Sequence, residues 1–567
     1  MEKQLALEMR GITKRFGPVV ANNRVNLDVY RGEILAVLGE NGCGKTTLMN
    51  MIAGIYFPDE GHILIDGQEV VIRSPKDAFD HGIGMIHQHF KLVDLFTAAE
   101  NIVLGISEKG RYNLKTVNEK VKAIADRYGF NIDPAKKIYD MSVSEKQTVE
   151  IVKVLYRGAD ILILDEPTAV LTPQEITRLF EVLKRMKEDG KSIIIITHKL
   201  NEVLEVSDRV AILRRGEHIA TVETKDTNEA ELTEMMVGKK VDLEIDRTMP
   251  VNAAPRLMVK NLNLDDNEGL HVLKDISFTA YGGEILGIAG IAGSGQRELL
   301  ESIAGLQPVK SGEIIFRNPK KDKPVTFFHK SMKRVKELGA QGAFHDGKMQ
   351  PVSFDGMSTS AVRKWVESGD VLFKEDEIIN LRDKTPLEIR GLGVRLSFVP
   401  EDRLGMGLVG SMGITDNMML RSYRKGPTIF LDRKKPRALA DEIIEELRVS
   451  TSSVNTPVRR LSGGNVQKVL VGREIAFAPK VLMAAYPVRG LDINSSYMIY
   501  NLLNKQKENG VAVIFVGEDL DVLLALCDRI LVINGGAVTG IVDARTATKE
   551  EIGLMMTKTD RNWKEGA

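Results

Sequence analysis

The stretch GENGCGKTT, residues 39–47, decides the fold of this chain. Its four fixed positions match the phosphate-binding pattern G-x-x-x-x-G-K-[ST]: Gly39, Gly44, Lys45 and Thr46. Glycines let such a loop turn tightly and aim backbone N–H groups at phosphate oxygens, the lysine reaches the β- and γ-phosphates, and the threonine hydroxyl binds Mg²⁺. An apolar run, residues 34–38, precedes the loop, and a helix-compatible run, residues 47–53, follows it. The sequence predicts a strand, a phosphate loop and a helix whose N-terminus faces the phosphates.

Every residue of this loop is therefore a predicted ATP ligand: Gly39, Glu40, Asn41, Gly42, Cys43, Gly44, Lys45, Thr46 and Thr47. Cys43 has two interpretations. The helix N-terminus should lower the pKa of its thiol, or it is a small filler residue. We expect thiol alkylation to block ATP hydrolysis and ATP to protect against it.

Composition narrows the class of protein. The 567 residues are enough for two or more domains with sizeable cores. Lys plus Arg equals Asp plus Glu, so the formal net charge is zero and gives no support for nucleic-acid binding. Two cysteines cannot build a disulfide framework and favour a cytosolic setting. The N-terminus has no secretion signal, and no apolar run approaches the roughly 18 residues of a membrane-spanning helix.

An aromatic side chain precedes the phosphate loop. Residues 5–9 and 25–29 are predicted strands, and Phe16 is expected in the loop between them. The face of Phe16 could stack on adenine; alternatively, the ring packs on the core.

Polar side chains follow three apolar strands beyond the loop. Gln88 could bind Mg²⁺ or the attacking water, although a lone glutamine is more often a surface residue. The buried run 161–164 ends in Asp165 and Glu166, where ligand sites occur in parallel sheets. Asp165 would hold Mg²⁺ through water, and Glu166 would act as general base on the attacking water. His198 could hydrogen-bond the γ-phosphate, or be a satisfied loop histidine.

The segment between these strands, residues 89–139, reads as helical and amphipathic. It carries an apolar cluster near Gln88, which is either core or a groove for a partner: Leu92, Val93, Leu95 and Phe96. MSVSEKQ then opens a helix, with Ser142 as N-cap and Glu145 completing a capping box.

In this order, the motifs resemble those of the ATP-binding-cassette family. The residues that carry the resemblance cover nearly the whole first half: Phe16, the loop at Gly39, Gln88, the helix at Ser142, Asp165, Glu166 and His198. The resemblance implies an α/β fold, a parallel P-loop core with a helical subdomain. It also implies that two cassettes hold ATP between the phosphate loop of one and a Ser-Gly-Gly helix of the other.

The chain then repeats itself. Residues 281–300 parallel residues 30–49, at an offset of 251. Three later motifs share an offset of 320: Ser142 to Ser462, Asp165 to Ala485 and His198 to Glu518. We predict two tandem cassettes, 1–240 and 257–567, joined by a linker, 241–256. An insertion near 318–384 explains the change of offset and should form a small surface appendage.

The two copies differ in chemistry. The second replaces every charged or metal-binding group needed for phosphoryl transfer: Lys45 by Gln296, Thr46 by Arg297, Gln88 by Glu401, Asp165 by Ala485, Glu166 by Tyr486 and His198 by Glu518. The opposite holds for the signature helix, because Ser462, Gly463 and Gly464 are intact where the first copy has Ser142, Val143 and Ser144.

Pairing the halves head to tail, as the resemblance implies, gives one complete ATP site. The catalytic residues Lys45, Glu166 and His198 would face the N–H groups of Ser462, Gly463 and Gly464. The metal would be held by Thr46, Gln88 and, through water, Asp165. Losing several such groups should leave negligible turnover at the other site. We expect one hydrolytic site and one structural site.

Two cassettes in one chain resemble importer ATPases for monosaccharides and nucleosides, as do the stretches AVLTPQE and PEDRLGMGLV. Ala485-Tyr486 in place of a second Asp-Glu pair is more similar to the nucleoside branch, although Tyr486, Val488 and Ser144 depart from its pattern. The resemblance implies ATP, Mg²⁺, two membrane permease subunits, an extracytoplasmic substrate-binding lipoprotein and a peripheral place on the cytoplasmic face of the membrane. The alternatives are a monosaccharide importer ATPase, a soluble twin-cassette factor acting on ribosomes or DNA, and a regulatory ATP-binding protein.

Overall fold

A computed structural model describes most of the chain. The residues described are 4–87, 90–106, 113–169, 171–240, 245–250, 253–266, 269–291, 293–319, 343–345, 348–350, 352–367, 372–373, 376–398, 407–420, 423, 431–476, 479–489, 491–517 and 519–557. The chain divides into two compact units. The first comprises 1–245, 488–500 and 548–557, and the second comprises 246–487, 501–547 and 558–567.

The first unit is built on a mainly parallel sheet with the strand order β10–β9–β3–β8–β7–β6. Its strands are β3 (Ile34–Leu38), β6 (Ile83–Ile86), β7 (Ile161–Asp165), β8 (Ser192–Ile196), β9 (Arg209–Arg214) and β10 (Glu217–Glu223). Strands β3, β7 and β8 are buried along their whole length, as parallel strands covered on both faces are. Because these three strands run parallel, the residues that follow them share one edge of the sheet.

A second, antiparallel sheet of the first unit has the order β2–β1–β4–β5: β1 (Leu5–Phe16), β2 (Val19–Tyr30), β4 (Glu60–Ile65) and β5 (Gln68–Val70). The strands β1 and β2 are longer than the alternation of their residues predicted. Phe16 is the last residue of β1, paired with Val19, and does not lie in a loop. The reason is a series of register shifts between β1 and β2, which interrupt the side-chain alternation while the backbone pairing continues.

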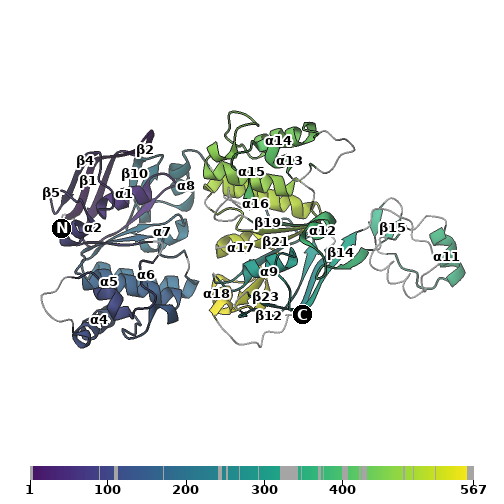
Figure 1. Cartoon of the computed structure of the whole chain (residues 1–567), viewed down its shortest axis with the longest axis horizontal. Helices are drawn as coiled ribbons and strands as arrows, with labels where there is room; N and C mark the ends of the chain where they lie inside the picture. The colour runs from purple at the N-terminus through teal and green to yellow at the C-terminus, as the bar shows by residue number, and fades with distance from the viewer. Residues whose placement is uncertain are drawn as a thin grey trace. The chain divides into compact units, whose positions relative to one another are not determined.

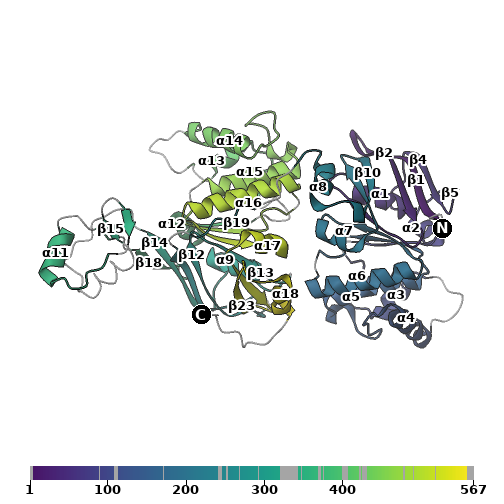
Figure 2. The same cartoon turned by 180° about the vertical axis from the view of Figure 1, so that it is seen from behind.

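Helices surround these sheets: α1 (Lys45–Ile52), α2 (Pro75–Asp80), α3 (Ala98–Val103), α4 (Leu114–Tyr128), α5 (Val143–Tyr156), α6 (Pro173–Glu188), α7 (Leu200–Val206) and α8 (Glu229–Val237). In Figure 1, α4, α5 and α6 lie on the opposite side of α7 from the antiparallel strands, and Figure 2 shows the same arrangement from behind. The segment 89–139 is not one helix, because α3 and α4 are separate and residues 129–137 are not helical. Gly129 ends α4 in the left-handed conformation.

The second unit repeats this plan. Its mainly parallel sheet has the order β19–β20–β21–β13–β22–β23: β13 (Ile285–Ala289), β19 (Val394–Phe398), β20 (Val481–Ala485), β21 (Ala512–Val516), β22 (Arg529–Asn534) and β23 (Ala537–Asp543). The antiparallel sheet has the order β12–β11–β14–β18: β11 (Ala254–Asp265), β12 (His271–Gly282), β14 (Ser311–Pro319) and β18 (Asp376–Asn380). The helices of this unit after β12 include α9 (Gln296–Ile303), α12 (Pro386–Leu392), α13 (Ile414–Met419), α14 (Lys434–Glu446), α15 (Gly463–Ile475), the part of α16 (Ile493–Glu508) from residue 501 onward, and α17 (Leu520–Leu526). The start of α16 and the helix α18 (Lys549–Thr557) belong to the first unit. The α/β fold class predicted from the sequence is confirmed.

The inserted segment extends the antiparallel sheet of the second unit, since β18 pairs with β14. Between them lie β15 (Ala343–His345), β16 (Lys348–Gln350), α11 (Thr359–Glu367) and β17 (Leu372–Phe373). Figures 1 and 2 show β15 and α11 projecting beyond the β14–β18 pair. The insertion therefore has secondary structure of its own.

An aspartate that is ion-paired with a lysine holds the start of the central strand in each unit. Asp208 Oδ2 accepts a hydrogen bond from Ile34 N–H at 2.9 Å, and Asp528 Oδ2 accepts one from Ile285 N–H at 2.9 Å. A lysine lies against each aspartate, Lys187 at 2.5 Å and Lys507 at 2.8 Å. The two isoleucines are separated by the offset of 251 found in the sequence, and the aspartates and the lysines by the offset of 320. The duplication therefore extends to contacts between residues outside the sequence motifs.

Candidate functional site: the phosphate loop and the adjoining strand ends

The phosphate loop connects β3 to α1 and depends on two glycines for different reasons. Gly44 caps α1 with a φ of 100°, a left-handed conformation that favours glycine. A Cβ on Gly39 would lie 2.3 Å from the carbonyl oxygen of Leu213 and 2.5 Å from Cys43 Sγ, so Gly39 is required by close packing. The helix begins at Lys45, two residues earlier than the sequence predicted, because Gly44 already ends the loop.

Lys45 lies over this loop. Its side chain is buried, and its Nζ donates to the carbonyl oxygens of Gly39 at 2.7 Å and Glu40 at 3.0 Å. The buried Asn22 of β2 donates from Nδ2 to the carbonyl oxygen of Gly44 at 3.3 Å. No sequence motif contains Asn22, because its place beside the loop comes from strand pairing.

Cys43 does not have the activated thiol that the sequence suggested. The residue is 5% exposed, and burial raises the pKa of its thiol above the ordinary value. The expectation that this pKa is lowered was wrong, because desolvation of the thiolate outweighs the charge of Lys45 and the backbone hydrogen bonds that favour the thiolate.

Two adjacent carboxylates end β7 and lie in different environments. Burial first, and then the charge of Glu166, raise the pKa of Asp165 to about 6. The hydroxyl of Thr46 donates to Asp165, which brings the start of α1 and the end of β7 together. A hydrogen bond from His198 lowers the pKa of Glu166.

The Glu166–His198 pair joins the ends of β7 and β8. His198 Nδ1 lies 3.0 Å from Glu166 Oε1, and the histidine side chain is 49% exposed. Because the lowered pKa keeps Glu166 ionised near neutral pH, the carboxylate accepts and Nδ1–H donates. In the neutral tautomer that donates from Nδ1, Nε2 is the acceptor nitrogen of the ring. Glu166 has a φ of 48°, a left-handed conformation rare for a residue other than glycine.

Two further residues fix the turns that carry this pair, and neither was identified from the sequence. Glu202 Oε2 accepts hydrogen bonds from Thr168 Oγ1 at 2.5 Å and from Thr197 Oγ1 at 3.4 Å. Gln147 of α5 donates from Nε2 to the carbonyl oxygen of Pro167 at 2.7 Å. They could have been found only from contacts between segments distant in sequence.

Phe16 lies apart from these contacts. Its side chain is 43% exposed, its ring meets Tyr56 edge-on at 5.3 Å, and Lys14 Nζ lies 5.6 Å from the ring centroid. Neither neighbour belongs to the phosphate loop. An exposed aromatic face is compatible with base stacking.

The two signature helices begin differently. In the first unit, Ser142 caps α5 and forms the complete capping box with Glu145 that the sequence predicted. In the second, Ser462 caps α15 and is exposed, and Gly463 and Gly464 are the first helical residues. Glycine leaves the backbone N–H groups of that first turn uncovered by side chains.

The second unit has the same backbone turns without the same chemistry. Gln296 takes the place of Lys45 and donates from Nε2 to the carbonyl oxygen of Ile291 at 3.1 Å. Arg297, in place of Thr46, donates to Glu301 Oε1 at 2.7 Å. Tyr486 keeps the left-handed turn of Glu166, with a φ of 51°, but packs against the apolar core beside Ala485. No metal-binding oxygen replaces Asp165 at Ala485.

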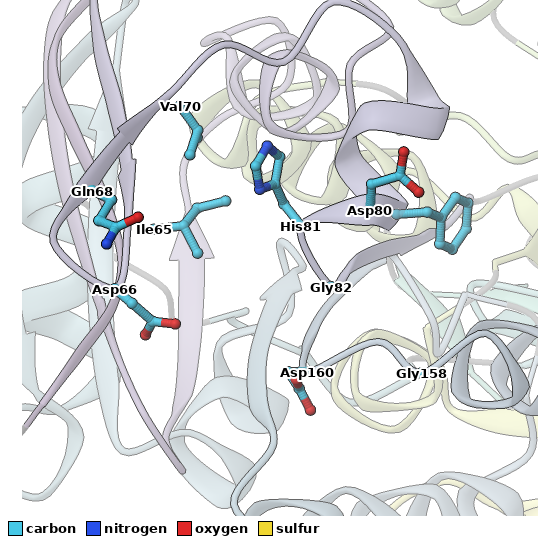
Figure 3. Close-up of a pocket in the computed structure, with 10 residues that line it drawn as sticks. Ile65, Asp66, Gln68, Val70, Asp80, His81, Gly82, Gly158 and Asp160 are labelled. Carbon is cyan, nitrogen blue, oxygen red and sulfur yellow. The ribbon is translucent and has the colours of Figure 1, made fainter.

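Gln88, Glu401 and Glu518 lie outside the described residues, so their predicted roles stay predictions. A hollow of about 540 Å³ lies at the opposite edge of the first sheet, where β6 and β7 begin. Figure 3 shows Asp66, Asp80, His81 and Asp160 around it. Its acidic lining is opposite in charge to what phosphate binding requires.

The oxygen atoms at the Thr46–Asp165 contact suit Mg²⁺. A hydroxyl and a carboxylate are ligand types that this ion prefers, and the raised pKa of Asp165 reports a buried negative charge that a cation would stabilise. The described residues include no cluster of three His, Cys, Asp or Glu side chains that could hold a metal ion without further ligands. The fit is therefore that of Mg²⁺ shared between protein and nucleotide phosphates.

Comparison with known proteins matches this site. The family described as ABC transporter matches residues 22–169. The chain is 39% identical over 561 residues to the nucleoside import ATP-binding protein NupA of Lactococcus lactis, covering 98% of this chain and 99% of that protein. It is 39% identical to the guanosine import ATP-binding protein NupO of Bacillus subtilis, covering 98% and 97%. It is 35% identical to the ribose import ATP-binding protein RbsA of Corynebacterium glutamicum, covering 99% and 95%.

Proposed function

The chain belongs to the ABC transporter family of import ATP-binding proteins, and on that basis we propose that it has one competent ATPase site and powers nucleoside uptake. As an import ATPase it converts ATP and water to ADP and phosphate. Within the described residues, no helix combines the length and hydropathy needed to cross a bilayer. The proposal places the chain on the cytoplasmic face of the membrane, bound to two permease subunits that receive solute from an extracytoplasmic lipoprotein.

The observation that carries the single-site proposal is the contrast between the two units at equivalent strand ends. The first unit joins Thr46 to Asp165 and His198 to Glu166. At the matching place, the second unit has an alanine and a tyrosine packed on the core. Several missing charge-stabilising groups leave the second phosphate loop unable to support phosphoryl transfer.

The residues of the first unit supply the chemistry. Lys45 exchanges its hydrogen bonds with the loop carbonyls for bonds to the β- and γ-phosphates, and the loop N–H groups bind the remaining oxygens. Thr46 and, through water, Asp165 would hold Mg²⁺, which would supply neutralisation of the phosphate charge during transfer. Glu166 accepts a proton from the attacking water, and His198 Nε2 accepts a hydrogen bond that orients this water.

The N–H groups at Ser462, Gly463 and Gly464 complete the site in this proposal. A helix N-terminus carries positive partial charge, and glycine allows phosphate to approach the backbone closely. The pairing of the first phosphate loop with α15 is an expectation from the family.

The identity of the solute is proposed from the relatives. NupA and NupO are named for import of nucleoside and guanosine, and the match covers 99% and 97% of their lengths. A monosaccharide is the second candidate, because the ribose import protein RbsA is 35% identical. A complex purified with its permeases and receptor should hydrolyse ATP faster with a nucleoside than with ribose. Stimulation by ribose and not by nucleosides would favour the second candidate.

Permease contact is proposed at two exposed apolar loops. In the first unit, Val93, Leu95 and Phe96 are 39%, 73% and 38% exposed. In the second, Val409 and Met412 are 39% and 37% exposed. Family analogy places permease helices at the loops that contain Gln88 and Glu401, and these side chains lie close to both in sequence.

Replacing Glu166 by glutamine tests the single-site proposal. Glu166→Gln should lower hydrolysis by the assembled complex about 100-fold or more, because the amide cannot take the proton of water. ATP binding should remain. Tyr486→Phe, the matched control at the equivalent position, should keep near-normal hydrolysis. The proposal would be wrong if the Glu166→Gln variant kept substantial hydrolysis and the additional substitution Tyr486→Phe abolished it. That result would place the chemistry in the second unit.

A further inference from the structure

Each unit has a segment that carries exposed apolar side chains and is hydrogen-bonded both to the signature helix and to the turn just before that helix. We define segment A as residues 91–97 of the first unit and segment B as residues 407–413 of the second. They are equivalent at an offset of 316. No sequence motif contains the contacts that hold them.

The first set of bonds lies just before the signature helix. In segment B, the carbonyl oxygens of Met412 and Gly410 accept hydrogen bonds from the N–H groups of Val458 and Arg459, both at 3.0 Å. These donors precede Ser462 by only a few residues. Segment A has the equivalent pair, in which Ile138 N–H donates to Phe96 at 3.0 Å and Tyr139 N–H donates to Asp94 at 3.1 Å.

A buried asparagine holds the middle of each segment. Asn417 of α13 is 0% exposed, its Oδ1 accepts from Val409 N–H at 2.8 Å, and its Nδ2 donates to the carbonyl oxygens of Val409, Met412 and Gly413 at 3.2, 3.3 and 3.1 Å. Asn101 does the same in segment A, with Val93 at 2.8 and 3.1 Å and Thr97 at 3.0 Å.

A basic side chain near the end of each signature helix holds the other end of the segment. Arg473 of α15 is 2% exposed and donates from Nη2 to the carbonyl oxygen of Gly407 at 3.0 Å. A Cβ on Gly407 would lie 2.9 Å from Leu470 Cδ2, so the segment also packs directly on α15. In the first unit, Lys153 Nζ donates to the carbonyl oxygen of Lys91 at 3.2 Å.

These contacts connect segment B to α15 at both ends. The Arg473 bond lies in the last turn of the helix, and the bonds from Val458 and Arg459 lie just before its first residue. A continuous α-helix rises about 1.5 Å per residue, so the two points are separated by roughly 16 Å of rigid helix. A displacement of segment B must therefore displace the N-terminus of α15.

We propose that Arg473 and Asn417 are positioning residues that make segment B and α15 one rigid body, through which a permease at segment B moves Ser462, Gly463 and Gly464. This inference rests on the proposed function, in which those three residues serve the competent site. Segment A has the same links, but its helix begins with Val143 and Ser144. The glycine helix is thus controlled from the second unit, which lacks catalytic groups of its own.

The first test measures coupling in the complex with permeases and loaded receptor. Because Arg473→Met also removes the ion pair with buried Glu474, at 2.8 Å, Glu474→Gln is included in every variant and measured alone as the reference. Relative to that reference, Arg473→Met should reduce receptor-stimulated hydrolysis about fivefold or more and change unstimulated hydrolysis and ATP affinity less than about twofold. Arg473→Lys should restore stimulation, since Lys153 makes the equivalent bond.

Two results would overturn the proposal. One is stimulation by Arg473→Met within about twofold of the reference, a change too small to be coupling. The other is an equal fall in stimulated and unstimulated hydrolysis, which a general structural role would produce.

The second test needs no permease, so it separates this inference from the proposed function. In the isolated chain, Asn417→Ala should speed hydrogen exchange of the backbone amides of segment B and, together with them, those of residues 458–464. The matched variant Asn101→Ala should do the same for segment A and residues 138–144 and leave the second unit unchanged. Faster exchange in segment B without any change at 458–464 would show that the two do not move together.

Discussion

Asp165 and Glu166 are neighbours in sequence whose proton affinities are shifted in opposite directions. Burial raises the pKa of Asp165 to about 6, whereas the hydrogen bond from His198 lowers that of Glu166. Opposed shifts of this kind suit the two roles proposed above, a carboxylate that holds Mg²⁺ through water and an ionised acceptor for the proton of water. The shifts follow from the environments and not from the residue types.

The raised pKa of Asp165 predicts a stability change with pH. Between its ordinary value of 3.8 and about 6, the folded chain binds more protons than the unfolded chain, so the free energy of unfolding falls as pH rises. Above this window the full cost of ionising the buried Asp165 carboxyl remains, roughly 3 kcal/mol. Without nucleotide or Mg²⁺, Asp165→Asn should therefore melt higher than the wild type near pH 7.5, measured by thermal scanning.

This gain should shrink as pH falls from about 6 and disappear below 3.8, where both the folded and the unfolded wild type become protonated at Asp165. Added Mg²⁺ and ATP should raise the melting temperature of the wild type more than that of Asp165→Asn. A variant less stable than the wild type at every pH would contradict the assignment of a buried charge.

The environment of Cys43 predicts slow labelling. With its thiol pKa raised by burial, little thiolate exists near pH 7.5, so iodoacetamide should react more slowly than with a free thiol. The rate should keep rising with pH above 9. Mass spectrometry can count this modification as a single site, because Cys527 is fully buried. Rapid labelling that levels off below pH 7 would mean an activated thiol. We still expect the modified protein to lose ATP hydrolysis.

At the scale of elements, the two signature helices differ at their N-termini: α5 has the more stable cap, and α15 has the more accessible N–H groups. The first turn of α5 is covered by the capping box of Ser142 and Glu145, which Lys136 reinforces with Nζ 2.7 Å from Glu145 Oε1. That of α15 has two glycines and a longer capping contact, 3.5 Å from Asn465 N–H to Ser462 Oγ. Capping stabilises a helix start, whereas bare glycines leave it free to bind an anion.

Serine-to-alanine substitution should separate these roles. Ser142→Ala should lower the free energy of unfolding by about 1 kcal/mol, because it removes a complete cap. It should change hydrolysis little. Ser462→Ala should affect stability less and lower hydrolysis by the complex more, measured by denaturant unfolding and phosphate release. Equal loss of hydrolysis in both variants would argue against a special role for α15.

At the scale of the whole molecule, the duplicated units share their architecture and differ at the site. Three features recur in both units: the strand order, the aspartate–lysine pair at the start of the central strand, and the left-handed turn at Glu166 or Tyr486. A buried framework is retained because many contacts depend on it, whereas a few substitutions at strand ends change which chemical groups the site contains.

Nucleotide stoichiometry tests this division. In the assembled complex, Glu166→Gln should retain slowly exchanging ATP at one site per chain, because only the first phosphate loop has the lysine and the metal ligands. Equilibrium dialysis followed by release of bound nucleotide would count the sites. Lys45→Ala should abolish this occupancy, whereas Gln296→Ala should not. Two slowly exchanging nucleotides per chain would contradict a single competent site.

The sequence by itself determined the fold class, the duplication, the capping box at Ser142 and the family. These depend on local patterns and fixed spacings, such as the glycines of the phosphate loop and the repeated offset of 320, which need no knowledge of distant contacts. Family membership and the import function are confirmed by full-length relatives. The pairing of the halves and the catalytic roles stay predictions.

Tertiary structure alone decided the rest. Phe16 lies on a strand, and the pKa of Cys43 is raised where a lowered one was expected. The pKa values of Asp165 and Glu166 are shifted in opposite directions. Asn22, Asn417 and Arg473 make contacts that no motif predicted. Burial and hydrogen bonding join residues far apart along the chain, and the free energy of a charge depends on that surrounding. No local pattern contains this information. The sequence motifs therefore predicted the type of reaction, whereas the tertiary structure determined the position and environment of each side chain.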